Sequence, residues 1–539
     1  MFTRRTLLKR GGCAALATAV PMLIRTARAQ ASSFNYYIAP TGSDSNPGTL
    51  ASPWSINAIN TRQSTYAGKS VGVMAGTYNI YALCQALASS GSQQTAALSV
   101  NGGTAGSPTL IASCNAGGVY TPRVAIITAA NPSGGGYPTN PCGMIGQGGG
   151  NPPPNLGNVI IDGFYITRGF QYGVNFYLNS TEVAINGNGD GGATGIEVRN
   201  CEIVDIGGVV DNNVAGVFLQ NCTGAWIHNN KIHSVQPTTG GNATDVAGIF
   251  SYFCYSNIYE YNTIYDCNQA FRDKFYPNGN HTLRYNYIEI NGLFPTGALG
   301  DGSGGSVGDT YTVYNNVFNV IGAGAALWYS NVWPNGKSEN TAYAFYNNTC
   351  IFPSGGNGAF LPAGGANVGA SAKATHYNNV YQYAGTPNYQ GVIAVVAGGL
   401  ALSDYNLYGA GAASGAYLTV APVSYTHLDV YKRQAHNSMV QAFVELGALG
   451  LWLYLATYYV TWKELGRIAA ARRQKVPDKD STQVALYARA FRISLACNLA
   501  AGFFLSQAYS ASLWMSVALC AAFVRIASQK IPPTAPVAT

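Results

Sequence analysis

Three observations predict an all-β fold, a parallel β-helix, over residues 30–422 of the sequence. The block G-V-F-L-Q-N-C-T-G-A-W-I-H-N-N-K-I (Gly216–Ile232) aligns without gaps on G-I-F-S-Y-F-C-Y-S-N-I-Y-E-Y-N-T-I (Gly248–Ile264). A shorter pattern built around asparagine recurs along the same region. The chain also holds 65 glycines and only 9% charged residues, which suits tightly turned, stacked strands. A short α-helical membrane fragment is predicted to follow this domain.

Residues 1–29 have the pattern of a signal peptide. A basic start, T-R-R-T-L-L-K, precedes an apolar run from Cys13 to Ile24, and the small-residue site Ala27-Arg28-Ala29 follows. An apolar run of about twelve residues is too short to span a bilayer. Arg4 and Arg5 indicate the twin-arginine export route. We therefore expect the domain at 30–422 to be periplasmic or extracellular. We also expect this domain to be monomeric.

The coils of residues 30–422 are marked by an Asn that is followed two residues later by an apolar or aromatic residue. Counted from the equivalent Cys201, the spacings are 29, 32, 24, 29, 32, 31 and 28 residues, and the positions are Asn230, Asn262, Asn286, Asn315, Asn347, Asn378 and Asn406. A β-propeller repeat of this length should show about four strands, whereas these repeats show two or three. Coils stacked about 4.8 Å apart would align these side chains in a ladder. We expect the ladder to be structural.

The start of this domain resembles a known family. The strings Y-Y-I-A-P-T-G-S-D-S-N-P-G-T-L-A-S-P-W (Tyr36–Trp54), V-M-A-G-T-Y (Val73–Tyr78) and A-G-S-P-T-L-I-A (Ala105–Ala112) are similar to the opening of secreted right-handed parallel β-helix proteins of the pectate-lyase-like superfamily. The resemblance implies a right-handed coil and a polysaccharide as the partner. It leaves the reaction open, because this scaffold hosts lyases, hydrolases, epimerases and non-catalytic modules.

The candidate catalytic residues are Lys274, Arg272 and Arg284. They lie in F-R-D-K-F-Y-P-N-G-N-H-T-L-R-Y-N (Phe271–Asn286), within a domain that has only 11 basic residues. Arg272 and Lys274 have strand spacing and should project from one face. In a polyuronate lyase Lys274 would remove the C5 proton, and a neighbouring arginine would lower its pKa.

A lyase of this kind also needs a cation to neutralise the substrate carboxylate. Asp211, Asp245 and Asp266 precede the equivalent strand in three consecutive coils, so their carboxylates are candidate Ca²⁺ ligands. The domain is thus predicted to be an exported polysaccharide-active protein, with polyuronate β-elimination as the reaction that these residues fit.

Other interpretations stay open. Arg272, Asp273 and Lys274 would also fit an exposed ion-pair set, with Arg284 an outward strand residue. The domain would then be a non-catalytic carbohydrate-binding or surface-structural module, in which Tyr and Trp ladders bind glycan. Hydrolysis by two carboxylates is less favoured, because the adjacent Asp-Asp, G-H-G and R-I-K type strings of glycosidases with this fold do not occur in this sequence.

Residues 423–434, V-S-Y-T-H-L-D-V-Y-K-R-Q, are interpreted as an artificial junction. The last six residues back-translate to GAT GTG TAT AAG AGA CAG, and the first six to nearly the reverse complement. This inverted repeat resembles the transposase mosaic end used to prepare sequencing libraries, and a peptide has no physical reason to encode one. The sequences on its two sides should therefore be read as two different proteins.

Charge differs on the two sides of the junction. The whole chain carries a formal net charge of +7. Residues 30–422 hold 11 Lys/Arg against 17 Asp/Glu, and residues 423–539 hold 12 against 5. A mildly acidic β-helix does not favour nucleic acid as a partner.

Residues 435–539 are predicted to be an inner-membrane fragment with two to three transmembrane helices, and the membrane is a partner only through this fragment. The candidate spans are Met439–Thr461 and a pair of short helices within Ile493–Val524. The string A-H-N-S-M-V-Q-A-F-V-E-L-G-A-L-G (Ala435–Gly450) resembles the terminal region of the O-antigen ligase and polymerase family. That resemblance implies a role for His436 in glycosyl transfer, in a fragment that should be inactive without its earlier helices. The alternative is an ordinary His-Asn cap before a membrane helix.

Overall fold

The computed structural model divides the chain into two compact units, Met1–Val423 and Ser424–Thr539. Each has a hydrophobic core made only of its own residues. Residues 423–434 lie outside the part of the chain that the structure describes. The described residues are 33–87, 95–139, 142–148, 153–178, 191–207, 213–236, 246–274, 279–290, 299–302, 310–321, 328–330, 342–352, 361–362, 374–383, 393–395, 400–404, 406–408, 418–420, 452, 455–469, 484–495, 520 and 523–524.

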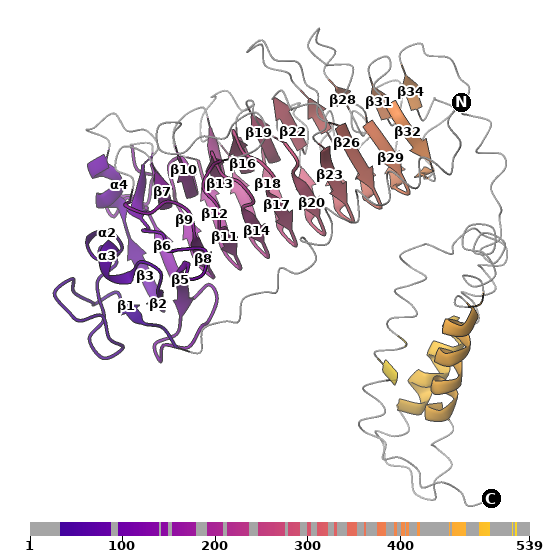
Figure 1. Cartoon of the computed structure of the whole chain (residues 1–539), viewed down its shortest axis with the longest axis horizontal. Coiled ribbons are helices and arrows are strands. Elements are labelled where there is room, and N and C mark those ends of the chain that lie inside the picture. The colour runs from indigo at the N-terminus through magenta and orange to yellow at the C-terminus, as the bar shows by residue number, and fades with distance from the viewer. Residues whose placement is uncertain are drawn as a thin grey trace, which may run out of the picture. The chain divides into compact units, whose positions relative to one another are not determined.

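The first unit is a solenoid of three long parallel sheets, and each full coil adds one strand to every sheet (Figure 1). Within the described residues the largest sheet has 12 strands: β1 (Tyr36–Ile38), β2 (Ser70–Met74), β5 (Thr109–Cys114), β8 (Val159–Asp162), β11 (Ile196–Arg199), β14 (Trp226–His228), β17 (Ile258–Glu260), β20 (Thr282–Arg284), β23 (Thr310–Tyr314), β26 (Ala342–Tyr346), β29 (Ala374–Tyr377) and β32 (Leu400–Asp404).

The second sheet has 11 described strands: β3 (Gly76–Asn79), β6 (Ala125–Thr128), β9 (Tyr165–Thr167), β12 (Glu202–Ile206), β15 (Lys231–Val235), β18 (Thr263–Cys267), β21 (Tyr287–Ile290), β24 (Val317–Val320), β27 (Thr349–Phe352), β30 (Val380–Tyr383) and β33 (Leu407–Tyr408). The third has nine: β4 (Ala96–Ser99), β7 (Gly143–Gly148), β10 (Tyr172–Tyr177), β13 (Val214–Gln220), β16 (Val246–Tyr252), β19 (Gln269–Lys274), β22 (Leu299–Gly302), β25 (Trp328–Ser330) and β28 (Leu361–Pro362). Strands β31 (Ile393–Val395) and β34 (Leu418–Val420) pair separately.

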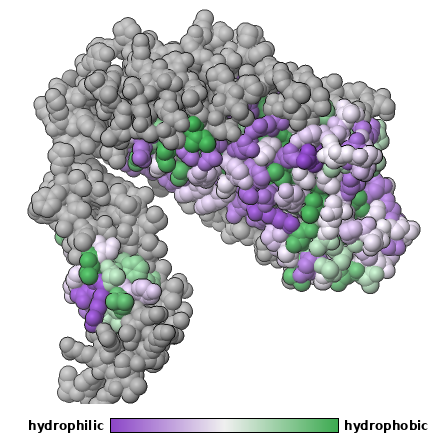
Figure 2. Space-filling model, turned by 180° about the vertical axis from the view of Figure 1, so that it is seen from behind, coloured by the Kyte–Doolittle hydropathy of each residue, from purple (hydrophilic) through white to green (hydrophobic). Residues whose placement is uncertain are grey.

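The strand register confirms the predicted β-helix. Val217 pairs with Ile249, Trp226 with Ile258, and Lys231 with Thr263, always in parallel. The two sequence blocks that align without gaps are therefore neighbouring coils, stacked residue on residue. Their inward positions, such as Val217 and Ile249, belong to the buried core. In the described part of the surface seen in Figure 2, hydrophilic residues are interspersed with smaller apolar groups.

Three short helices lie at the end of the solenoid that carries β1 (Figure 1): α2 (Ala58–Thr61), α3 (Gln63–Tyr66) and α4 (Tyr81–Leu87). The Asn60 side chain donates to the carbonyl of Ala97 and accepts from the amide of Ser99, at 2.9 and 2.8 Å. Gln63 donates to the carbonyl of Ser99 at 2.8 Å. β4 is an edge strand of the nine-stranded sheet, so these backbone groups have no neighbouring strand on that side. The bonds from Asn60 and Gln63 satisfy them instead.

The predicted asparagine ladder is present, but its phase is shifted by one residue in three coils. Asn230 donates through its side-chain amide to Asn262 Oδ1 at 3.1 Å, and Asn262 donates to Asn286 Oδ1 at 3.1 Å. The ladder then continues through Asn316, Asn348, Asn379 and Asn406. All seven asparagines of this ladder are buried. The predicted members Asn315, Asn347 and Asn378 each directly precede the actual ladder residue.

Those three asparagines form a second column at the corner between the 12-stranded and 11-stranded sheets. Seven residues of this column have a left-handed backbone with φ between 55 and 58°: Asn200, Asn229, Tyr261, Tyr285, Asn315, Asn347 and Asn378. Asn adopts this conformation more readily than other non-glycine residues. The two tyrosines therefore occupy positions that are backbone-compatible with Asn.

His376 is a buried titratable group in this solenoid. It is 1% exposed, and burial lowers its pKa from 6.5 to about 3. The unfolded chain therefore binds the additional proton between these two pH values. The stabilisation that comes from keeping His376 neutral is complete above pH 6.5, and it is lost as the pH falls, by up to about 1.4 kcal/mol per pH unit.

We expect His376→Gln to make the free energy of unfolding less dependent on pH between pH 6.5 and 4, as measured by denaturant titration. The control is His233→Gln, because the His233 side chain is 15% exposed and lies on the outside of the 11-stranded sheet. An unchanged pH slope in His376→Gln would contradict the expectation.

The second unit contains helical segments at 455–469 and 484–495. They pack through a small core that includes Leu465, Ala488 and Leu495, and the Arg492 guanidinium lies 4.3 Å from the centre of the Trp462 ring. No helix within the described residues is long and apolar enough to cross a membrane. The described helices thus give no support to the predicted transmembrane fragment. Most residues of its two candidate spans lie outside the part of the chain that the structure describes.

Candidate functional site

Two predicted catalytic residues, Arg272 and Lys274, lie on β19. Arg272 pairs in register with Phe250 and Lys274 with Tyr252, so both basic side chains share the outer face of the nine-stranded sheet. The Lys274 ammonium lies 5.7 Å from the centre of the Tyr252 ring. Arg272 is 2% exposed and Lys274 is 5% exposed. The two residues are brought together as expected, but neither presents its charged group to open solvent.

Asp273, between them, faces the interior. It accepts a hydrogen bond of 2.8 Å from Ser251, and its other carboxylate oxygen lies 3.6 Å from Nε2 of His281. The Asn257 amide donates to His281 Nδ1 at 3.1 Å, which places the imidazole proton on Nε2, toward Asp273. Burial lowers the pKa of His281 to about 3. Asp273 therefore forms no exposed ion-pair set with Arg272 and Lys274.

The third predicted catalytic residue, Arg284, lies on β20 in the 12-stranded sheet rather than on the sheet that holds Lys274. Its guanidinium forms an ion pair with Glu260, and it donates to Tyr314 Oη at 2.8 Å. Burial lowers the pKa of Arg284, but the bonds to Glu260 and Tyr314 outweigh it and raise the pKa above its ordinary value. Arg284 is thus part of a different group of residues.

The predicted Ca²⁺ ligands are not assembled in the described part of the chain. Asp211, Asp245 and the ligase-like His436 lie outside the described residues. Asp266 lies on β18, where its carboxylate accepts from Ser234 at 2.9 Å and from Gln236 at 2.7 Å. The described residues include no group of three side chains that could hold a metal ion.

A more extensive polar group lies on the outer face of the 12-stranded sheet. Parallel register aligns one outward position from each of five consecutive strands, β8 to β20. Glu197 projects from the same face two residues before one of them. We call this group the polar column, and its members are Asp162, Glu197, Arg199, His228, Glu260 and Arg284.

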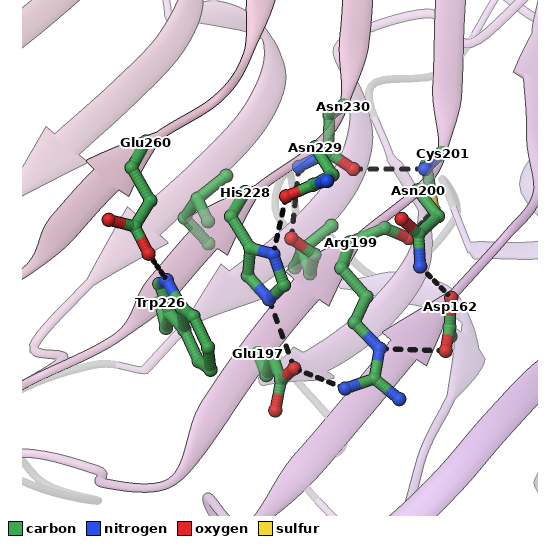
Figure 3. Close-up of polar contacts among 12 residues, drawn as sticks. Asp162, Glu197, Arg199, Asn200, Cys201, Trp226, His228, Asn229, Asn230 and Glu260 are labelled. Carbon is green, nitrogen blue, oxygen red and sulfur yellow. Dashed lines mark hydrogen bonds and ion pairs between the residues drawn. The ribbon is translucent and has the colours of Figure 1, made fainter. Parts of the chain in front are cut away.

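Arg199 connects the first part of the polar column (Figure 3). Its Nε donates to Asp162 at 2.7 Å and its Nη1 to Glu197 at 2.5 Å. Glu197 Oε1 also lies 3.0 Å from His228 Nε2. Burial raises the pKa of Glu197, but the hydrogen bond from His228 and the charge of Arg199 outweigh it, so that the pKa is lowered. Glu197 is therefore ionised at neutral pH and acts as an acceptor.

Trp226 and Glu260 connect the rest of the polar column. The indole Nε1 of Trp226 donates to Glu260 at 2.7 Å, and the indole ring stacks on His228 with 3.9 Å between ring centres. Glu260 also binds Arg284. Each of these side chains is held by at least two partners, so the polar column is a rigid and largely buried arrangement of charged groups.

The polar column continues into a patch of stacked tyrosines. Tyr285 contacts Tyr261 with ring centres 4.9 Å apart and Tyr314 at 5.9 Å. Tyr346 stacks on Tyr314 at 5.0 Å and on Tyr377 at 4.8 Å. Tyr261 is 53% exposed and Tyr285 is 42% exposed. We call these five residues the tyrosine patch. Burial raises the pKa of Tyr346 and Tyr377, so both hydroxyl groups remain protonated at neutral pH.

Apart from Arg284, the residues of the polar column and the tyrosine patch were missed by sequence reasoning. Arg199, His228, Glu260, Arg284 and Tyr314 each stand two residues before a ladder position. That offset was the signal that could have found them. It was obscured because adjacent Asn residues left the phase of the ladder undefined in three coils.

No family model matches this sequence, and no curated protein matches it. Among solved structures, the chain is similar to GH136 lacto-N-biosidase from Eubacterium ramulus, with 15% identity over 69% of this chain and 67% of that chain and a TM-score of 0.38. It is also similar to XylC in complex with xylose, with 12% identity over 69% of this chain and 86% of that chain and a TM-score of 0.33. The pectin methylesterase from Aspergillus niger is 11% identical over 74% of this chain and 93% of that chain, with a TM-score of 0.22. These likenesses are too distant to carry an inference about ligand or reaction.

Proposed function

We propose that the β-helix is an exported, monomeric protein that binds a polysaccharide along the outer face of its 12-stranded sheet. The observation that carries this proposal is the tyrosine patch, in which five rings are joined by four successive ring contacts and adjoin the polar column through Arg284. Aromatic rings offer apolar area to the C–H groups of a sugar, and their hydroxyls offer hydrogen bonds. Successive coils repeat this chemistry about every 4.8 Å, in the direction of the solenoid axis.

The rigidity of the surface also supports binding. A ligand loses affinity when side chains must be ordered on binding. The tyrosines are held by their neighbours, and Arg284 is fixed by Glu260 and Tyr314. An extended polymer would therefore meet an ordered surface that spans several coils.

We expect the double variant Tyr261→Asn/Tyr285→Asn to bind polysaccharide at least about tenfold more weakly, because it removes the two most exposed rings. Asn is chosen because neighbouring coils carry Asn in the same left-handed conformation. Binding is measured by isothermal titration calorimetry against soluble neutral and acidic polysaccharides, with the full chain in detergent and with residues 30–422.

The matched control is Tyr265→Ala, which removes a partly exposed tyrosine from β18 on the 11-stranded sheet. It should bind as the parent protein does. Failure of the parent protein to bind any polysaccharide would overturn the proposed function, and equal binding by the double variant would exclude the tyrosine patch.

A second candidate function is polyuronate β-elimination at Lys274. It is favoured by one observation, the shared outer face of Arg272 and Lys274 beside the Tyr252 ring. In this reaction Lys274 would take the C5 proton of the uronate, and the electrons of the C5–H bond would form the C4–C5 double bond. The electron pair of the broken C4–O bond would leave on the oxygen of the departing sugar, which takes up a proton to become a hydroxyl. The same titration samples are read for absorbance of that double bond, with and without Ca²⁺. Absence of absorbance in every polyuronate would rule out the lyase.

A further inference from the structure

We propose that the polar column makes the binding face selective for a neutral, hydroxyl-rich sugar and against a uronate. This inference rests on the proposed polysaccharide-binding function and specifies the ligand class. It is carried by the way in which the charged groups of the column are already paired with one another.

The carboxylates of the polar column outnumber its guanidinium groups. The carboxylates are Asp162, Glu197 and Glu260, and the guanidinium groups are Arg199 and Arg284. Arg199 is shared between two carboxylates, and Arg284 is bound by the third. Neither arginine therefore provides an unneutralised positive charge for an acidic sugar.

Burial makes these pairs hard to exchange. The side chains of Arg199 and Asp162 are 5% and 0% exposed. A uronate that recruited Arg199 would have to separate it from Asp162 or Glu197 and leave a buried carboxylate without its partner. A sugar hydroxyl has no charge and requires no such exchange.

The groups that remain for a ligand suit hydroxyls. The described hydrogen bonds to Glu197 fall on Oε1, and Figure 3 shows the second oxygen pointing away from Arg199 and His228. Arg199 binds its two carboxylates through Nε and Nη1. The third guanidinium nitrogen, Nη2, is therefore the one that we assign to a ligand. A carboxylate acceptor beside a guanidinium donor can bind two neighbouring hydroxyls of one sugar ring, one as donor and the other as acceptor.

A ligand carboxylate in the place of these hydroxyls would bind unfavourably. It would bring a negative charge next to the ionised Glu197 in a partly dehydrated site, where like charges repel more strongly than in water. Glu197 is therefore assigned as a specificity-determining residue, which both accepts a hydroxyl and excludes an acid.

The test compares one glycan in two charge states. A soluble neutral β-glucan that binds residues 30–422 is oxidised at its C6 hydroxymethyl groups to the uronate, so that the linkage is kept and only the charge differs. Calorimetry should show binding to the oxidised polymer about tenfold weaker than to the neutral one. If no β-glucan binds, the same comparison uses neutral galactan or mannan and its C6-oxidised form.

Glu197→Gln provides the residue-level test. It keeps the shape of the side chain but removes its charge, so the ratio of the two affinities should fall toward one. Glu289→Gln is the matched control, because Glu289 is a partly exposed glutamate on β21, in the 11-stranded sheet. The control should keep the parent ratio, and thermal unfolding of both variants confirms that they are folded.

The outcomes separate the two proposals. Equal or tighter binding of the oxidised polymer by the parent protein overturns the selectivity and leaves polysaccharide binding in place. An unchanged ratio in Glu197→Gln overturns the assignment of Glu197. Failure of every neutral and acidic polymer to bind overturns the proposed function itself.

Discussion

The variant Asn316→Ala is expected to lower the free energy of unfolding by about 3 kcal/mol, because it leaves several buried polar groups without partners. Asn316 donates from its side chain to Leu283 O at 3.0 Å and to Asn348 Oδ1 at 3.0 Å. Its own Oδ1 accepts from both the backbone and the side-chain amide of Asn286, at 3.0 and 2.9 Å. Alanine supplies none of these bonds, and the residue is only 1% exposed, so water cannot readily replace them.

The measurement is a denaturant titration of residues 30–422 at neutral pH. Asn319→Ala is the matched control, because Asn319 lies three residues away on β24, is partly exposed, and donates from its side chain to Glu289 at 3.0 Å. It should change stability by less than about 1 kcal/mol. Equal losses in the two variants would show that the ladder contributes no more than a surface amide.

The variant Arg199→Met should be the more damaging change, with a loss of about 3–5 kcal/mol, because it breaks a buried ion pair from one side. Methionine fills much of the volume of the arginine but cannot donate to Asp162 or Glu197. Asp162 would retain only its neutral donors, Tyr120 at 2.6 Å and Asn200 at 2.8 Å. The carboxylates would then be buried without a compensating charge.

Lys231→Met is the control for this prediction. Lys231 pairs with Glu202 at 2.7 Å, but the two side chains are 36% and 17% exposed, so that water screens the pair. Its loss should change stability by less than about 1 kcal/mol. The comparison is again made by denaturant titration, and a small effect of Arg199→Met would mean that the polar column relaxes when its central cation is removed.

The sequence was sufficient to predict the coil and the stacking of neighbouring coils. Gly216–Ile232 and Gly248–Ile264 align because equal coil lengths place equal side chains on the core, and the register reproduces that alignment. The ladder phase was less well determined. Asn315 and Asn316 are adjacent, and only the backbone decides that the first takes the left-handed corner and the second points inward.

The candidate site was harder to predict, because it depends on which sheet each strand joins. Strand spacing placed Arg272 and Lys274 on one face, as the structure has them. Arg284 follows only ten residues after Lys274, but it lies on β20 in the 12-stranded sheet, whereas Lys274 lies on β19 in the nine-stranded sheet. The polar column draws its charges from strands that are far apart in sequence, and only their shared offset of two residues from the ladder positions relates them.

The asparagine ladder also has a consequence for how such a domain can change its length. The side-chain bonds from Asn230 to Asn262 and from Asn316 to Asn348 both span 32 residues and join the same two atoms, Nδ2 and Oδ1, at 3.1 and 3.0 Å. A duplicated or deleted coil would therefore meet the same donors and acceptors at its new boundaries. Gene duplication could lengthen the solenoid by whole coils without redesign of its interior, and each added coil would extend the outer face by one more position on which a new ligand contact can evolve.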